Sequence, residues 1–307
     1  MVIGAGVIGL TTAVALRDAG VDAHIVSRDR PAATTSDIAA AIWYPTMAKP
    51  QLAVQAWNAR TRDVLNGLAG GRDTGVFLAE IHEYLIDTSE PPWRDDVPGY
   101  RRLTADELPA NRAAGFSLEV PRVEPPIYLR SLVHRFGTSG GVITEDVVDD
   151  LGGLADEYGV VVNCAGLAAG ALANDDQVFP IRGHVVLVGN PGITRGILDE
   201  VEEVSYVLPR THEVVLGGTR QVGDWDTTPD PETTRRILRR AAELEPKLDG
   251  AEVLGERVGL RPGRTSVRVE AEAAGDGLII HNYGHGGSGY GLAWGCAEAV
   301  VDLVLGA

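Results

Sequence analysis

Residues 1–20, which read MVIGAGVIGLTTAVALRDAG, decide the fold. Three residues of a short apolar strand precede a glycine-rich turn. The helical spacing of Leu10, Ala13 and Val14 then predicts a helix. The apolar stretch VDAHIV at residues 21–26 follows as the next parallel strand. The N-terminus is therefore predicted to form a strand, helix, strand unit. The brevity of the opening strand leaves open a start upstream of Met1.

The glycines of the turn have the spacing G-x-G-x-x-G. At this position Gly4 permits the tight turn, Gly6 lets the backbone approach a pyrophosphate, and Gly9 lets helix and strand pack closely. The positive end of the helix would hold the pyrophosphate. The pattern predicts a dinucleotide-binding site.

The end of the second strand bears on which dinucleotide is bound. Folds that bind NAD usually place Asp or Glu there to hold the ribose, whereas this chain has Ser27 and Arg28 and reaches Asp29 only later. This substitution counts against NAD. Arg28 would suit the 2′-phosphate of NADP, so a non-catalytic module that senses NAD(P) is one alternative.

Composition limits the possible partners. A chain of 307 residues exceeds the size at which single cores usually stop growing, which predicts two domains. The net charge of −16 argues against nucleic acid and against an anionic membrane surface. Cys164 and Cys296 are far apart and form no metal-binding spacing, so no disulfide and no metal site is expected. With neither a leader nor a long apolar run, we expect a cytoplasmic protein.

Later segments predict a second domain. Mixed helices and polar loops begin near residue 50 and indicate an insertion. GVVVNCAG at 159–166 is typical of a buried parallel strand, whereas GHVVLVG at 183–189 and HEVVLGGTRQ at 212–221 suggest a largely antiparallel sheet. An amphipathic helix is predicted over 229–248, with its four arginines on a solvated face.

Residues 281–295, HNYGHGGSGYGLAWG, contain six glycines just before the last apolar helix. Each glycine weakens a regular element by roughly 0.5–1 kcal/mol relative to alanine. This density indicates that a ligand comes close to the backbone there.

Several stretches together resemble the D-amino-acid oxidases, in order and approximate spacing. The resemblance covers nearly the whole chain and is loose only from about residue 50 to 120. It is carried by GAGVIGL (4–10), TTSDIAAAIWYP (34–45), VVNCAGLAAGAL (161–172), PIRGHVVLV (180–188), YVLPR (206–210), LGGTRQVGDWD (216–226), VGLRPGR (258–264) and the glycine-rich stretch.

The resemblance implies an α/β fold and FAD as the cofactor. A discontinuous Rossmann-like FAD-binding domain would comprise residues 1–48, 127–178 and 261–307. A substrate domain on a mixed, largely antiparallel sheet would comprise residues 49–126 and 179–260. A homodimer is left open.

The family's FAD contacts carry over to positions in four parts of the chain. Val147 matches a backbone contact to adenine, and the glycine-rich stretch runs past the flavin, where free N–H groups and the helix dipole stabilise the anionic reduced ring. Ala41 and Ala165 depart from residues found in some relatives, Gly and Thr respectively. The implied contacts are Gly4, Ala5, Gly6, Val7, Ile8, Gly9, Arg28, Asp29, Thr34, Thr35, Ser36, Ala40, Ala41, Ile42, Val147, Ala165, Gly286, Gly289, Tyr290 and Gly291.

The resemblance also assigns the substrate contacts. Arg261 would clamp the carboxylate of a D-amino acid, Tyr206 would donate to the same carboxylate, and the carbonyl of Gly287 would accept from the amine. The Cα hydride passes to FAD, the imino acid hydrolyses to a 2-oxo acid and ammonia, and dioxygen reoxidises the flavin to give hydrogen peroxide. Hydride transfer needs no base, so His285 is expected to be a packed residue.

Substrate preference depends on three departures whose roles the sequence leaves open, at Tyr44, Glu202 and Arg220. D-Aspartate oxidases carry arginine at the position of Arg220, which makes D-aspartate oxidation the nearest alternative. The segment ILDEVEEVSY at 197–206 is acidic and would repel a second carboxylate. We therefore expect neutral or hydrophobic D-amino acids, with Arg220 outside the site and near Asp224 and Asp226.

Overall fold

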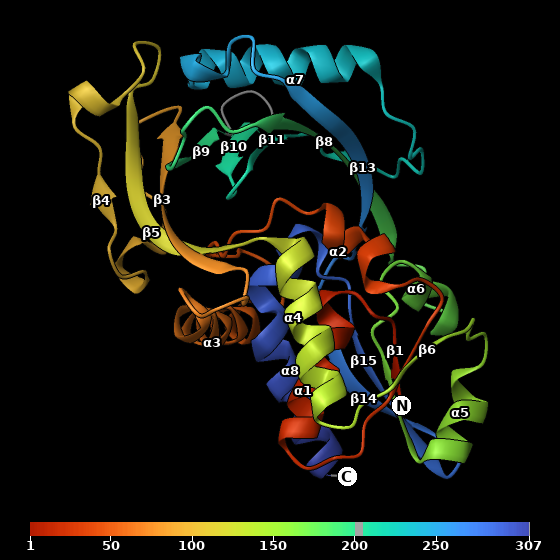
Figure 1. Ribbon diagram of the computed structural model, residues 1–307. Helices are drawn as coiled ribbons and strands as arrows, with labels where there is room; N and C mark the ends of the chain where they lie inside the picture. Colours follow the sequence, from red (N-terminus) through yellow and green to blue (C-terminus); the bar gives the residue numbers. More distant parts are fainter. Residues whose placement is uncertain (200–204, 307) are drawn as a thin grey trace. The chain divides into compact units, whose positions relative to one another are not determined.

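The computed structural model describes residues 1–199 and 205–306, and it divides the chain into two compact units (Figure 1). The first unit comprises Met1–Val76, Val123–Ile181 and Arg261–Ala307, and the second comprises Phe77–Arg122 and Arg182–Leu260. The division is discontinuous. Its boundaries differ from the expected ones chiefly at residues 49–76, which belong to the first unit.

A parallel sheet forms the centre of the first unit. Among the described residues it has six strands, and β15, β7, β1, β2 and β6 are mutually parallel, whereas β14 is antiparallel to β15. This confirms the predicted strand, helix, strand unit and the parallel strand at 159–166. In sheet order the strands are β14 (Arg268–Ala274), β15 (Gly277–Tyr283), β7 (Val160–Asn163), β1 (Val2–Ile3), β2 (Ile25–Ser27) and β6 (Ile143–Glu145).

Helices cover both faces of this sheet. On one face α5 (Leu151–Tyr158) packs Leu151 and Ala155 against Ile3, Val161 and Ile279. On the other face α1 (Val7–Asp18) contributes Thr12, whose hydroxyl accepts a hydrogen bond of 3.1 Å from the buried amide of Asn282. Figure 1 shows α4 (Pro125–Thr138) and α8 (Gly289–Leu305) beside α1. Two short helices, α2 (Thr35–Ile38) and α6 (Ala168–Leu172), complete the unit.

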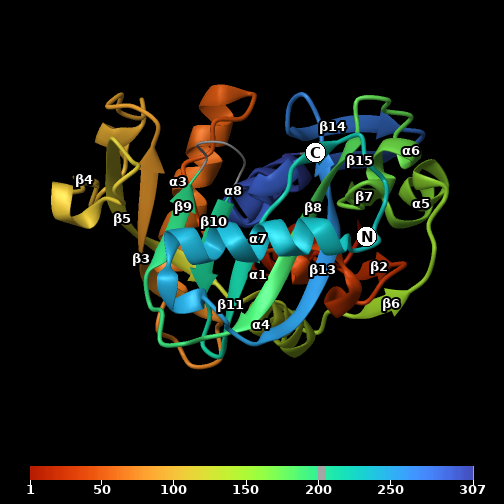
Figure 2. The same ribbon diagram turned by 90° about the horizontal axis from the view of Figure 1, so that it is seen from above.

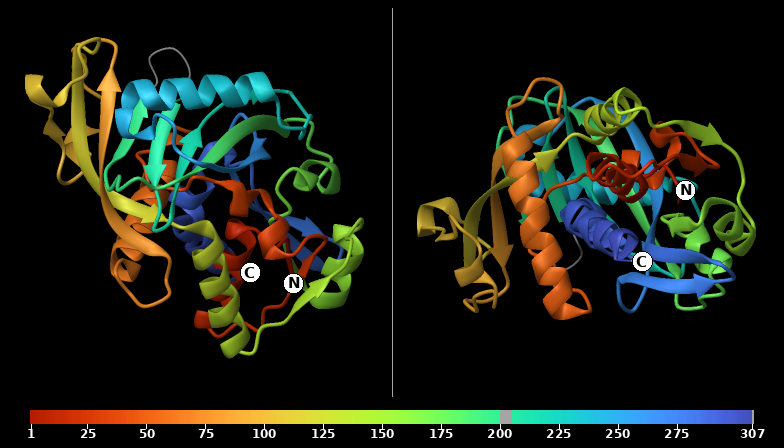
Figure 3. Two further views of the ribbon diagram at one scale, coloured as in Figure 1. Left: turned by 45° about the horizontal axis from the view of Figure 1, so that its top comes forward. Right: turned by 90° about the horizontal axis from the view of Figure 1, so that it is seen from below.

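Helix α3 (Gln51–Leu68) explains why residues 49–76 belong to the first unit. It lies against α8 so closely that a Cβ at Gly295 would overlap the backbone of Trp57 (Figure 3). The N–H of Gly295 donates to Thr61 Oγ1 at 3.0 Å, and Asn58 Nδ2 donates to the carbonyl of Gly291 at 3.0 Å. Gly295 therefore serves helix packing, and the sequence assigned α3 to the wrong unit.

The second unit is built on a mixed, largely antiparallel sheet, as expected. Neighbours β8 and β11, β11 and β10, and β10 and β9 are antiparallel, whereas β9 and β3 are parallel. Over the described ranges its nine strands are β3 (Val76–Leu85), β4 (Arg101–Arg102), β5 (Ala114–Val123), β8 (Phe179–Gly189), β9 (Gly196–Asp199), β10 (Ser205–Pro209), β11 (Glu213–Gly217), β12 (Gln221–Val222) and β13 (Val253–Gly263).

Helix α7 (Pro231–Leu244) covers one face of this second sheet (Figure 2). The Asp230 carboxylate accepts from the N–H of Thr233 at 3.0 Å and so caps the helix, with Pro231 at its first position. Ile237 and Ala241 are buried against the sheet, next to Val186, Val188, Val207 and Leu216 among others. Arg235 is exposed and pairs with Glu232 at 2.6 Å, in keeping with a solvated face. Across the part of the chain that is described, no helix has both the length and the apolar character that a membrane span requires.

Candidate functional site

The residues expected to bind the cofactor gather at one edge of the parallel sheet. Because β1, β2, β6, β7 and β15 run in the same direction, the segments that follow them lie at their common carboxyl edge. In open α/β sheets, ligands bind outside the carboxyl ends of the strands. The segments are residues 4–9 after β1, 28–29 after β2, Val147 shortly after β6, Ala165 after β7 and 284–291 after β15.

The three glycines of the N-terminal turn have three different environments. Gly4 has a φ of +104°, and a Cβ there would lie 2.6 Å from the carbonyl oxygen of Cys164. A Cβ at Gly9 would overlap the carbonyl oxygen of Gly4. A Cβ at Gly6 would meet only Ser36 Oγ, at 3.0 Å. Packing therefore requires glycine at 4 and 9, whereas Gly6 leaves the backbone open to a ligand, and the first turn of α1 supplies N–H groups without intrahelical partners. The turn fits a pyrophosphate.

Residues 34–42 are held beside the N-termini of α1 and α8. Ser36 Oγ accepts from the N–H of Val7 at 2.9 Å, and Tyr290 Oη donates to the carbonyl of Ser36 at 2.9 Å. A Cβ at Gly289 would lie 3.7 Å from Val7 and 3.9 Å from Ile8. The structure thus brings together expected contacts from three separate parts of the sequence.

Ala41 adopts a left-handed backbone conformation, with a φ of +56°. Its carbonyl accepts from the N–H of Val123 at 2.8 Å, which holds the segment in this conformation. Glycine adopts such a φ without a steric cost, whereas alanine does not.

The end of β2 contains a serine that the sequence analysis did not single out. Ser27 Oγ accepts from the N–H of Ala5 at 3.1 Å and donates to the carbonyl of Asp29 at 2.8 Å, so it links the glycine turn to the second strand. The exposed guanidinium of Arg28 pairs with Asp29 at 2.7 Å. An arginine already paired with a carboxylate is a poor site for the 2′-phosphate of NADP.

Two more polar side chains support the same edge. The N–H of Val147 donates to Asp146 Oδ1 at 2.8 Å. The N–H of Ala165 donates to the buried Asn163 Oδ1 at 3.3 Å. Neither of these two hydrogen bonds was predicted from the sequence.

The glycines of the 281–295 stretch divide into two groups. Gly284, with a φ of +84°, lies against Arg264, where a Cβ would be 2.7 Å from the arginine Cβ, and Gly295 lies against α3. At Gly286, Gly287 and Gly289, a Cβ would meet nothing closer than 3.7 Å. Gly286 has a φ of +55°, which itself favours glycine. Packing does not require glycine at Gly287 and Gly289, where the close approach of a ligand is a reason for it.

Arg261 lies next to the middle of this stretch. A Cβ at Gly287 would be 3.7 Å from Arg261 Cδ and 4.0 Å from its Nε, and Gly287 itself is exposed. The structure therefore places the expected carboxylate clamp and the expected acceptor for the amine side by side.

His285 is packed rather than poised to take a proton. The residue is only 6% exposed, and its Nε2 is buried with no hydrogen-bond partner among the described residues. Burial lowers the pKa of the imidazole to about 4, so the ring is neutral near pH 7. This environment agrees with its expected absence from catalysis.

Tyr206 belongs to β10 of the second unit. It lies directly opposite Gly217 of β11 and opposite Leu198 of β9. Glu202, whose role the sequence leaves open, lies outside the described residues. Tyr44 contributes its carbonyl, which accepts from Asn58 Nδ2 at 3.0 Å.

Arg220, which was expected near Asp224 and Asp226, forms no ion pair with either carboxylate among the described residues. Arg182 holds this loop instead, since its guanidinium donates to the carbonyls of Asp226 and Thr228 at 2.6 Å each and lies 3.9 Å from Asp224. Arg182 is buried, whereas Arg220 is exposed. The sequence pattern favoured Arg220 because it is nearer to these aspartates along the chain. The sequence does not reveal that the sheet brings Arg182 on β8 to the same loop.

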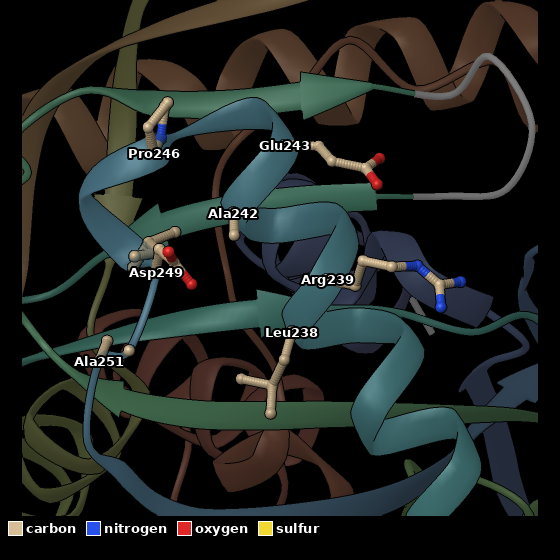
Figure 4. A pocket seen from close by; sticks show the side chains of 9 residues that line it. Leu238, Arg239, Ala242, Glu243, Pro246, Asp249 and Ala251 are labelled. Carbon is tan, nitrogen blue, oxygen red and sulfur yellow. The ribbon is translucent and has the colours of Figure 1, made fainter.

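A separate hollow lies in the second unit between α7 and the turn that follows it (Figure 4). None of the residues predicted to bind cofactor or substrate lines it. The lining residues include Leu238, Arg239, Ala242, Glu243, Pro246, Asp249 and Ala251.

Comparisons with known proteins bear on this site. A model of the family described as FAD dependent oxidoreductase matches residues 1–303. The D-amino-acid oxidase of Rubrobacter xylanophilus is 46% identical over 308 residues, which cover 99% of this chain and 94% of that protein. The D-aspartate oxidase of Homo sapiens is 37% identical, with 99% and 93% covered. The solved structure of glycine oxidase from Geobacillus kaustophilus superimposes with a TM-score of 0.85 at 19% identity. The match covers 99% of this chain and 93% of that protein, so the two share the fold.

Gly6→Val is expected to purify without flavin, because the side chain would stand between the backbone and the pyrophosphate. Gly137→Val is the matched control, since Gly137 lies exposed in α4 and a Cβ there would meet nothing within 4 Å. Flavin content and far-ultraviolet circular dichroism are measured on both. A folded Gly6→Val protein that retains full flavin would remove the glycine turn from the pyrophosphate site.

The pKa of His285 predicts a pH dependence of stability. Between its ordinary pKa of 6.5 and its folded pKa of about 4, the unfolded chain binds a proton that the folded chain does not. Stability therefore falls as the pH falls through this range. Replacing His285 with Gln is expected to reduce the loss of unfolding free energy between about pH 7 and about pH 5 by roughly 2 kcal/mol. Urea unfolding at both pH values tests this, and equal losses in the two proteins would show that His285 is not responsible.

Proposed function

Because the chain belongs to the family of FAD-dependent oxidoreductases, we propose that it oxidatively deaminates D-amino acids. The products are a 2-oxo acid, formed by hydrolysis of the imino acid, and ammonia. Bound FAD supplies the hydride acceptor, and dioxygen restores it and is reduced to hydrogen peroxide. Two free, buried cysteines, Cys164 and Cys296, support a reducing compartment such as the cytoplasm as the place of action.

The observation that carries the proposal is the proximity of Arg261 and Gly287 at the carboxyl edge of the parallel sheet. The guanidinium presents a planar pair of donors, which can hold a carboxylate through two charge-assisted hydrogen bonds. Pro262 restricts the backbone beside it. Gly287 is exposed, and by resemblance its carbonyl would accept from the amine. When the carboxylate and the amine are held at these two points and the Cα hydrogen must point at the flavin, only one enantiomer fits, so the arrangement supports a stereospecific reaction.

The remaining chain contributes positioning and electrostatics. Gly286, Gly287 and Gly289 let the ring come close to the backbone, and the N-terminus of the 17-residue helix α8 favours negative charge on the ring. By resemblance, Tyr206 donates its phenolic proton to the substrate carboxylate. No base is assigned, since the amine enters neutral and the hydride leaves directly.

The preferred substrates are proposed to be neutral or hydrophobic. The strand neighbours of Tyr206 support this. Leu198 lies opposite Tyr206 on β9, and Gly217 lies opposite it on β11. Val185 on β8 in turn lies opposite Gly217. These aligned residues share one face of the sheet, and they would meet an apolar side chain more readily than a carboxylate. The acidic composition of residues 197–206 acts in the same direction.

Arg261→Met is expected to abolish oxidation and leave FAD bound, because it removes the charge that fixes the substrate and not the cofactor's own contacts. Tyr206→Phe serves as the milder comparison. It deletes one donor but keeps the ring, so it should raise KM more than it lowers kcat. Activity and flavin content are measured on the same samples, and unchanged activity in Arg261→Met would remove this residue from the site.

The side-chain preference is tested with D-valine, D-methionine and D-aspartate as substrates of the native protein and of Arg220→Ala. We expect the native protein to have the higher kcat/KM for the two neutral substrates and the substitution to change the ratio little. A strong native preference for D-aspartate that collapses in Arg220→Ala would instead identify a D-aspartate oxidase.

A further inference from the structure

The ring of Tyr206 occupies the space that a side chain at residue 217 would fill. Tyr206 and Gly217 are directly opposite each other on antiparallel strands, so their side-chain positions share one face of the sheet. A Cβ at Gly217 would overlap the tyrosine ring at Cζ, together with its hydroxyl. The distal end of the ring therefore lies over Gly217 of β11.

Gly218, the next residue, leaves room for the phenolic oxygen of Tyr206. A Cβ at Gly218 would lie 3.2 Å from Tyr206 Oη and 3.3 Å from the carbonyl oxygen of His184. The hydroxyl thus rests above the junction of two consecutive glycines, close to the adjacent strand β8.

The residues on the two sides of Tyr206 differ in size, and this difference sets the direction in which the ring leans. Leu198 lies opposite Tyr206 on β9, and Gly217 lies opposite it on β11. A leucine fills its side, whereas the glycine leaves the other side empty for the ring. The opposite face of the sheet is not available, since Val207 and Leu216 there pack into the core with Ile237 of α7.

We infer that Gly217, assisted by Gly218, is a positioning residue that fixes where Tyr206 presents its hydroxyl to the substrate carboxylate. This inference rests on the proposed function and deepens it. A methyl group at residue 217 would force the ring to rotate away from β11, because the overlap is with Cζ, Cε2 and Oη, and these atoms belong to a rigid ring that moves as a whole. The hydroxyl would then leave the place from which it donates.

Gly217→Ala is therefore expected to raise KM for a neutral D-amino acid about tenfold, as loss of one hydrogen bond to a charged group would, with a smaller effect on kcat. Gly218→Ala, where the approach is less close, should give a smaller rise in the same direction. Gly189→Ala is the matched control on neighbouring β8, because a Cβ there would meet nothing within 4 Å. Binding of the 2-oxo acid product, followed through the flavin absorption spectrum, provides a readout that does not depend on turnover.

A double-mutant cycle separates positioning from a general loss of structure. In a Tyr206→Ala background the ring is absent, so the added Gly217→Ala substitution should not raise KM further and should be tolerated by the fold. The inference is overturned if Gly217→Ala leaves KM unchanged, if its effect adds fully to that of Tyr206→Ala, or if Tyr206→Phe itself does not weaken carboxylate binding.

Failure of the proposed function would look different. In that case the native protein would bind flavin but oxidise no D-amino acid. Should Gly217→Ala not fold, Gly218→Ala and the double variant still decide the question, because the first is a milder displacement and the second restores the missing space.

Discussion

The first unit depends on a contact between two pieces of backbone. Helix α1 begins so close to the end of β1 that any side chain at Gly9 would overlap the carbonyl oxygen of Gly4, and Gly4 itself needs a positive φ to make the turn. Only this close approach puts the positive end of α1 at the carboxyl edge of the sheet. A β-carbon at either position would push the helix away from the strand, and the pyrophosphate site would go with it.

The other elements of the site are arranged around that helix end. Ser36 accepts from the N–H of Val7, and Tyr290 donates to Ser36, so the 34–42 segment and the start of α8 are tied to the start of α1. Gly289 brings α8 alongside. Two helix N-termini therefore lie at one sheet edge, and each favours a negatively charged group. In the proposed arrangement these groups are the pyrophosphate at α1 and the reduced ring at α8.

Much of this arrangement could be predicted from the sequence because it depends on local patterns. The spacing of Gly4, Gly6 and Gly9 and the flanking apolar stretches predicted the strand, turn and helix, and the antiparallel strands of the second unit were indicated by alternation. What could not be predicted depends on contacts between distant residues. Helix α3 belongs to the first unit because it packs on Gly295, more than two hundred residues further along the chain. Arg182, not Arg220, holds the 221–228 loop because the sheet brings it there. Glycine density predicted a ligand near residue 286, but only the surroundings of each glycine separate those that serve packing from those that do not.

The central claim is that a D-amino acid delivers a hydride to flavin held at this edge. The most direct test is the absorption spectrum of the purified protein before and after a neutral D-amino acid is added without oxygen, with the L-enantiomer as control. We predict a flavin spectrum that bleaches with the D-enantiomer, stays unchanged with the L-enantiomer and recovers when air is admitted. A colourless protein, or a flavin that neither enantiomer reduces, would contradict the account.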